Sequence, residues 1–292
     1  MPPFDELRAV VWGQSLATFA VKSSDTEILT RAETVLQHWR QDLQPVPPQT
    51  TWTIEREGGG LIIHNDQTGE NQLIENPNRM VSVLESLASL QIAANHQAAT
   101  TVHGGLVAKG GKGVLIVGPS HSGKSTLTTY LWRRGWDLLA DDVSIIDDQN
   151  LCAIPVLRRV SLRRPSLSLI GEDLFHKILE TPSCDETPEG WVFHPSELEG
   201  RPRPAATRIS AIIFLKRSNT DVPPARLEKI LPAFAMVALL PYTNVIRAVG
   251  FGDAMPRLEN LLNHVPAYDL GRGELQAMAA TVEQLVDTLA QP

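Results

Sequence analysis

The chain has 292 residues, of which 42% are hydrophobic and 20% are charged, and its formal net charge is −7. This composition predicts a globular protein with a sizeable core, and the acidic balance argues against nonspecific nucleic-acid binding, which requires a basic face. The two cysteines, Cys152 and Cys184, lack the C-x-x-C spacing of zinc and redox motifs, so we expect neither a disulfide framework nor a zinc site.

The N-terminal residues do not show a basic segment followed by an apolar one, which is the pattern of a secretory signal. The longest apolar stretch, residues 230–240, is about half as long as a membrane-spanning helix. We therefore expect a cytoplasmic protein without membrane association.

Strand-like and helix-like patterns alternate through the first hundred residues. Apolar residues recur at helical spacing in two stretches, and Asp25 and Asn76 stand where the N-caps of these helices are expected. The predicted elements are one or two strands in 8–22, a helix over 25–40, a linker over 41–51, a hairpin or short meander over 51–74, and a helix over 77–94. They predict a small α/β module over residues 1–98, in which no residue carries visible chemistry.

The pattern changes near residue 100, where longer apolar runs begin. The predicted elements are strands over 101–108 and 114–117, a helix over 125–134, a strand over 136–146, loops with short helices over 155–205, a strand over 209–215, helices over 231–240 and 255–264, a strand over 267–270, and a helix over 274–289. Strands mixed with helices favour an α/β fold, and we expect this domain to span residues 99–292.

Residues 118–125 match the motif G-x-x-x-x-G-K-[ST] in full, directly after an apolar strand and at the start of a helix. Such a loop points backbone N–H groups at phosphate oxygens, its lysine reaches the β- and γ-phosphates, and its serine hydroxyl ligates Mg²⁺. The expected cofactors are ATP and Mg²⁺, and the expected contacts are Gly118, Ser120, Ser122, Gly123, Lys124, Ser125 and Thr126. His121 is expected to face solvent without a role.

Two adjacent acids, Asp141 and Asp142, follow in the sequence L-L-A-D-D-V-S-I-I. Neighbouring residues of a strand point to opposite faces, so the two carboxylates are expected to have different partners. A strand that returns beside the loop brings them near the γ-phosphate, where one can hold Mg²⁺ and the other can accept the proton of an attacking hydroxyl. These residues alone leave open which acid has which role.

Several motifs of other nucleotide-dependent proteins do not occur in the sequence. The guanine-reading N-K-x-D and the transporter motif L-S-G-G-Q do not occur, and the second acid is Asp142 rather than the glutamate common in hydrolytic ATPases. We interpret these absences as favouring phosphoryl transfer to an acceptor over hydrolysis.

Three stretches, V-H-G-G-L-V-A at 102–108, the motif within 113–126, and L-L-A-D-D-V at 138–143, resemble the core of the bacterial HPr serine kinase/phosphorylase family and, more closely, HPr-kinase-related proteins. That core is related to ATP-dependent phosphoenolpyruvate carboxykinase. The resemblance implies a P-loop core of this type, His103 beside the phosphates and the acceptor, Asp141 as catalytic base, Asp142 as support for the metal or the loop, and a catalytic Lys124. Because related enzymes form multimers, it is also compatible with a homo-oligomer.

The resemblance covers about residues 100–150, and the first hundred residues do not look like the family's N-terminal domain. The family's arginine-bearing signature has no clean counterpart, and each arginine of the cluster Arg158, Arg159, Arg163, Arg164, Arg201 and Arg203 is expected on a solvated loop face. We expect a kinase that transfers the γ-phosphate of ATP to a hydroxyl acceptor, for example a serine of a peptide or small protein. The alternatives are a catalytically inactive nucleotide-binding regulator and a small-molecule kinase.

Overall fold

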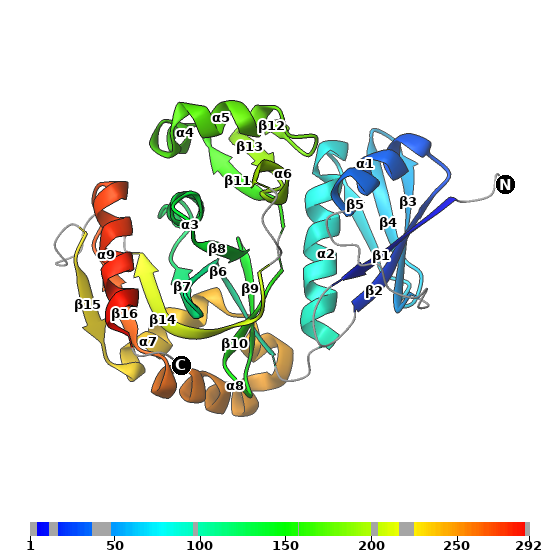
Figure 1. Ribbon diagram of the computed structural model, residues 1–292. Coiled ribbons are helices and arrows are strands. Elements are labelled where there is room, and N and C mark those ends of the chain that lie inside the picture. Colours follow the sequence, from blue (N-terminus) through cyan, green and yellow to red (C-terminus); the bar gives the residue numbers. More distant parts are fainter. Residues whose placement is uncertain are drawn as a thin grey trace. The chain divides into compact units, whose positions relative to one another are not determined.

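The computed structural model describes residues 5–11, 17–36, 48–95, 99–156, 158–199, 204–215 and 225–289. The chain divides into two compact units, Met1–Gln97 and Ala98–Pro292, and each is described by itself (Figure 1). Both units combine helices with a multi-stranded sheet, so the expectation of a mixed α/β protein is confirmed.

The first unit is a five-stranded sheet with the order β1-β2-β3-β4-β5 and two helices. Its elements are β1 (Asp5–Val11), β2 (Ala17–Ser23), α1 (Thr26–Leu36), β3 (Thr50–Glu57), β4 (Gly60–Asn65), β5 (Asn71–Ile74), the 3₁₀ turn η2 (Pro77–Arg79) and α2 (Met80–Asn95). The predicted meander and both helices are confirmed, while residues 37–47 of the predicted helix end and linker lie outside the described residues. Asn76 caps η2, because its side chain accepts a hydrogen bond from the Asn78 N–H.

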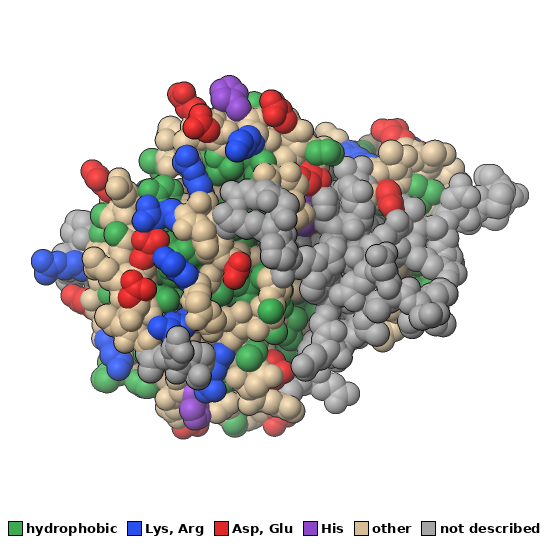
Figure 2. All heavy atoms as spheres, viewed as in Figure 1, with side chains coloured by type: hydrophobic (Ala, Val, Ile, Leu, Met, Phe, Trp, Pro, Cys, Tyr) green, Lys and Arg blue, Asp and Glu red, His purple; other side chains and the backbone are tan. Residues whose placement is uncertain are grey.

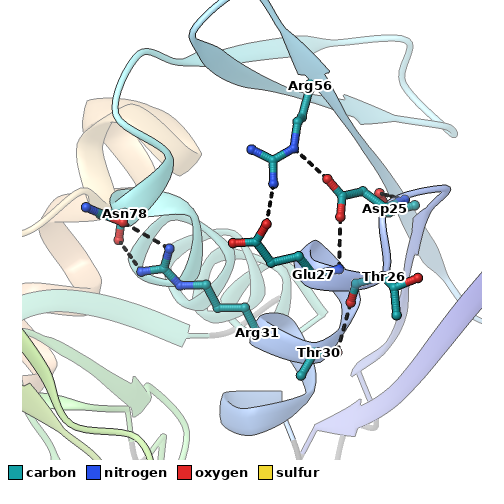
Figure 3. Close-up of polar contacts among 8 residues, drawn as sticks. Asp25, Thr26, Glu27, Thr30, Arg31, Arg56 and Asn78 are labelled. Atoms are coloured by element: carbon teal, nitrogen blue, oxygen red, sulfur yellow. Dashed lines mark hydrogen bonds and ion pairs between the residues drawn. The ribbon is translucent and has the colours of Figure 1, made fainter.

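Polar contacts hold the start of α1 to β3 (Figure 3). The predicted N-cap Asp25 accepts a hydrogen bond at Oδ1 from the Glu27 N–H, at 2.9 Å. Arg56 of β3 then bridges Asp25 Oδ2 at 2.5 Å and Glu27 Oε2 at 2.7 Å. The cap satisfies an N–H group that the helix itself cannot, and the arginine forms ion pairs with both acids.

The second unit is built on an eight-stranded sheet. Its strands are β6 (Ala99–Lys109), β7 (Lys112–Val117), β8 (Asp137–Ala140), β9 (Val143–Asp147), β10 (Cys152–Ile154), β14 (Thr207–Leu215), β15 (Leu227–Ile230) and β16 (Ala267–Leu270). The order is β10-β9-β6-β7-β14-β16-β15, with β8 on β6, and β10 also pairs with β14, so five strands close into a ring. Strands β7, β14 and β16 are parallel to one another, whereas β6 is antiparallel to β7.

Both faces of the central strand β7 are buried, which explains its continuous apolar sequence. Val114 and Ile116 point into one core with α3 (Lys124–Arg133) and α9 (Leu275–Thr288). Leu115 and Val117 point to the opposite face, into a core with α7 (Pro232–Leu239) and α8 (Val245–His264). Figure 1 shows the helices in these two layers.

The segment 155–205 differs from the prediction of loops with short helices. It contains a third sheet with the order β11-β13-β12, formed by β11 (Val160–Arg163), β12 (Asp185–Thr187) and β13 (Gly190–Phe193), and the helices α4 (Arg164–Ile170), α5 (Glu172–Leu179) and α6 (Ser196–Glu199). These strands have three or four residues, which is too short for a period of two to be recognised in the sequence.

Further elements were not predicted in full. Strands β10 and β15 were missed, and α8 begins at Val245, ten residues before the predicted start at residue 255. Gly250, at φ 82°, kinks α8 and hides the helical period of its first part. Among the described residues, no helix combines the length and the apolar character needed to cross a bilayer. On the face drawn in Figure 2, basic and acidic side chains of the described residues are interspersed.

Candidate functional site

The loop of residues 118–125, called the 118–125 loop below, connects the carboxyl end of β7 to the start of α3. Gly123 takes a left-handed φ of 98° as the residue before the helix. Gly118 packs so closely that a Cβ there would lie 2.7 Å from the Leu215 carbonyl oxygen and 2.8 Å from the Ser122 hydroxyl. The two glycines therefore permit a tight turn that leaves the positive N-terminal end of α3 facing the loop.

Lys124 is a buried cation within this loop. Its side chain is 8% exposed, and Nζ donates hydrogen bonds to the carbonyl oxygens of Gly118 at 2.8 Å and Pro119 at 3.2 Å. Burial lowers the pKa of Lys124, and the negative charges of Asp142 and Asp141 oppose that change. The lysine and both acids are therefore close enough to influence one another electrostatically.

The acid pair does not lie in the middle of a strand, as the alternating pattern predicted. A turn at Asp141 and Asp142 separates β8 from β9, and both strands pair with the same edge of β6. Within this turn Asp142 takes a left-handed φ of 71°. Aspartate tolerates this conformation better than most residues. The Gly104 N–H of β6 donates a hydrogen bond to the Asp142 carbonyl oxygen at 3.2 Å. The two carboxylates do have different partners, but a turn rather than strand alternation separates them.

Asp141 is the buried member of the pair, with 2% exposure. Burial and the neighbouring charge of Asp142 raise the pKa of Asp141 to about 6, against the lowering effect of a hydrogen bond from Ser125. Asp141 Oδ1 and the Ser122 hydroxyl are both buried without a hydrogen-bond partner among the described residues. An unpartnered carboxylate oxygen beside Ser125 and the adjacent carboxylate of Asp142 offer the oxygen ligands that a hard cation such as Mg²⁺ prefers, so the residues present fit this ion.

Asp142 is the open member of the pair, with a side chain that is 56% exposed. His103 Nδ1 lies 3.0 Å from Asp142 Oδ1, and Arg158 Nη1 lies 3.7 Å from Asp142 Oδ2. The hydrogen bond from His103, supported by the charges of His103, Arg158 and Lys124, holds the pKa of Asp142 below its usual value. Asp142 is therefore an ionised carboxylate that faces the solvent-accessible side of the site.

These residues surround a pocket of ≈ 190 Å³. The pocket is lined by His103, Ser120, His121, Gly123, Lys124, Ser125, Thr126, Asp142, Ser161, Arg163 and Ser166. Seven of the predicted site residues are among these, and the structure thus brings β6, the 118–125 loop and the β8–β9 turn together. The other three, Gly118, Ser122 and Asp141, are buried and do not line the pocket.

Sequence reasoning missed the wall of the pocket formed by β11 and α4. His121 was expected to be without a role, but its ring contacts the Arg163 guanidinium and both side chains line the pocket. The Thr126 and Ser166 hydroxyls share a hydrogen bond at 2.8 Å. The cluster of arginines at 158–164 indicated a basic region in the sequence. Which of these arginines reaches the pocket depends on the third sheet, which the sequence did not predict.

The expectation that each arginine lies on a solvated loop face is wrong for two of them. Arg158 and Arg159 are each only 6% exposed, because acidic side chains of neighbouring elements, Asp142 and Asp185, lie beside them. Arg201 and Arg203 lie outside the described residues. Within the described part of the chain, no group of three or more His, Cys, Asp or Glu side chains could hold a metal ion by itself. A cation here would therefore need oxygens from the loop and from a bound ligand.

The sequence matches no protein-family model and none of the curated proteins with which it was compared. A solved structure with some similarity is that of the HPr(Ser) kinase/phosphatase from Coxiella burnetii, with a TM-score of 0.34 and 16% identity, covering 64% of this chain and 97% of that chain. A TM-score this low supports no conclusion about function, so the site has to be judged from this chain's own residues.

Proposed function

We propose that this protein is a kinase that uses ATP and Mg²⁺ and transfers the γ-phosphate to a hydroxyl group of an acceptor. The observation that carries the proposal is the juxtaposition of Lys124 and Ser125, at the start of α3, with the acid pair that follows β8. The motif of residues 118–125 is the phosphate-binding part, and the acids supply the negative charge and the proton acceptor that phosphoryl transfer needs.

In this proposal the 118–125 loop holds the phosphates through its N–H groups and the positive end of α3. Lys124 exchanges its present carbonyl acceptors for the β- and γ-phosphate oxygens, which are stronger acceptors because they are charged. Ser125 and Asp142 would hold Mg²⁺, which when bound would supply positive charge to the phosphate oxygens during transfer.

The two acids differ in basicity, and this difference suggests their roles. A general base works best when its pKa is near the working pH, and Asp141, whose pKa is raised to about 6, is a better proton acceptor than Asp142, whose pKa is lowered. We assign Asp141 to the acceptor hydroxyl and Asp142 to the metal side, with His103 as the residue that orients Asp142.

The test is phosphate transfer from γ-labelled ATP with Mg²⁺ to a library of serine-containing peptides and, separately, to a library of hydroxyl-bearing metabolites. Lys124→Ala and Asp141→Asn should each lower transfer by about 10²-fold or more. Lys109→Ala is the matched control, because Lys109 lies on β6 but does not line the pocket. Transfer by both site variants at the wild-type rate would contradict the assignment, and the active library identifies the acceptor class.

One observation favours a second function, that of a nucleotide-binding regulator without turnover. Asp141 is 2% exposed, so an acceptor hydroxyl reaches its carboxylate only if the site rearranges. In that case the wild-type protein would bind Mg·ATP in a calorimetric titration and leave it intact during prolonged incubation with both libraries. Lys124→Ala would weaken this binding in the same way as in the kinase.

A further inference from the structure

The small sheet β11-β13-β12 carries arginines on or beside β11 and acids on or beside β12. Two of its ion pairs are tight: Arg159 Nη1 lies 2.6 Å from Asp185 Oδ2, and Arg164 Nη2 lies 2.7 Å from Glu186 Oε1. The Arg164 guanidinium also lies over the Trp191 ring, 4.7 Å from its centroid. These two arginines have strong partners within the sheet, and neither lines the pocket beside the 118–125 loop.

The third pair in this sheet is different. Arg163 Nη2 lies 3.4 Å from Glu189 Oε2, and the two side chains are 38% and 73% exposed. An exposed pair at this distance contributes little to stability. The other nitrogen, Nη1, contacts the His121 ring of the 118–125 loop. An imidazole nitrogen is a weaker partner for a guanidinium than a phosphate, which can accept two parallel hydrogen bonds.

Backbone geometry directs Arg163 toward the pocket. Ser161 and Arg163 are two residues apart on β11, so they share one face of the strand, and both line the pocket, while Leu162 is buried on the other face. Gly190 of β13 pairs with Arg163, and a Cβ at Gly190 would lie 2.0 Å from the Leu162 carbonyl oxygen. The absence of a side chain at Gly190 therefore permits the close strand pairing that places Arg163.

We propose that Arg163 binds the γ-phosphate of the nucleoside triphosphate in this pocket and thereby distinguishes a triphosphate from a diphosphate. This inference rests on the proposed nucleotide-binding function. His121 and Lys124 belong to the same loop and line the same pocket, and the lysine of such a loop reaches the β- and γ-phosphates. When the triphosphate binds, Arg163 exchanges Glu189 and His121 for phosphate oxygens and thereby ties β11 to the loaded loop.

The experiment measures the affinity of the full-length protein for AMP-PNP and for ADP, each with Mg²⁺, by isothermal titration calorimetry. Arg163→Gln should weaken AMP-PNP binding about tenfold and ADP binding much less, since a hydrogen bond to a charged group is lost only with the triphosphate. Glu189→Gln removes the anion that competes for Arg163 and should tighten AMP-PNP binding by about two- to threefold. Arg164→Gln is the matched control, for which the AMP-PNP to ADP affinity ratio should stay at the wild-type value.

Arg163→Gln is expected to weaken AMP-PNP binding and Glu189→Gln to tighten it, and these opposite effects distinguish ligand binding from a structural role. If Arg163 and Glu189 only held the sheet together, both variants would weaken binding in the same direction, and the inference would be wrong. An unchanged AMP-PNP to ADP ratio in Arg163→Gln would also overturn it while leaving the proposed function intact. If the wild-type protein bound neither nucleotide, the proposed function and this inference would fail together.

Discussion

Two clusters of acids and bases, one in each unit, differ in the burial and in the hydrogen-bond partners of their carboxylates. In the first unit Arg56 contacts both Asp25 and Glu27, and Asp25 also caps α1 (Figure 3). The hydrogen bond from Arg56 is the largest cause of the lowered pKa of Asp25. This cluster therefore stabilises the ionised form of Asp25.

The acid pair of the second unit has the opposite character. Asp141 is buried, its pKa is raised to about 6, and Oδ1 has no hydrogen-bond partner among the described residues. An unmatched buried carboxylate costs stability, and such an arrangement is typical of functional sites. The comparison teaches that a buried carboxylate oxygen without a partner among the described residues, rather than the mere presence of acids and bases, marks the candidate site.

The strongest test of this comparison measures phosphate transfer and stability in two variants, Asp141→Asn and Asp25→Asn. Asp141→Asn should lower phosphate transfer by about 10²–10⁴-fold, because it removes the proton acceptor. Its free energy of unfolding at pH 8 should be equal to or above that of the wild type, because a buried charge is removed. Asp25→Asn should leave transfer unchanged. A large loss of stability in Asp141→Asn would show that the carboxylate is structural.

The packing of α3 against β6 is the next test. An ideal Cβ at Gly105 would lie 2.3 Å from the Thr128 side chain, which is fully buried. Gly105→Ala should therefore lower the free energy of unfolding by about 1–3 kcal/mol and weaken Mg·ATP binding, since α3 carries the 118–125 loop. Gly59→Ala is the control, because a Cβ there has no neighbour within 4 Å. Chemical denaturation of both variants measures the difference.

The raised pKa of Asp141 predicts a dependence of stability on pH. The folded protein holds this proton up to about pH 6, whereas the unfolded chain loses it near the ordinary aspartate pKa of 3.8, so the contribution of Asp141 to stability decreases as the pH rises. Between pH 5 and pH 8, without nucleotide or Mg²⁺, the wild type should lose about 1 kcal/mol relative to Asp141→Asn. Urea denaturation at both pH values tests this. An equal change in the free energy of unfolding between pH 5 and pH 8 for the two proteins would contradict it.

The smallest effects are expected in the first unit. Asp25→Ala should cost about 1 kcal/mol of stability through the lost N-cap, whereas Asp25→Asn, which keeps a capping oxygen, should cost less. Because the pKa of Asp25 is lowered, its ionic contribution is present above the unfolded pKa near 3.8 and is lost as the pH falls through the lower native value. Denaturation at pH 7 and pH 3 compares the variants, and equal stabilities of Asp25→Ala and wild type at pH 7 would exclude the cap as a stabilising feature.

Elements with a long or strong pattern could be predicted from the sequence to within a residue or two. Strand β14 spans Thr207–Leu215 where residues 209–215 were expected, and α9 spans Leu275–Thr288 where residues 274–289 were expected. The short strands β11, β12 and β13 could not be predicted, because three or four residues carry too little periodicity. Because β11 carries Arg163, the wall of the pocket that contains this residue could not be predicted either.

By itself, the sequence determined the 118–125 loop, its place between a strand and a helix, and the presence of two acids soon after it, because these features depend on residues close together in the chain. Only the tertiary structure decided that Asp141 is buried and Asp142 open, that His103 and Arg158 contact Asp142, and that Arg163 reaches the loop. Burial and pKa depend on which distant residues exclude water and supply charge, and no local pattern encodes those neighbours.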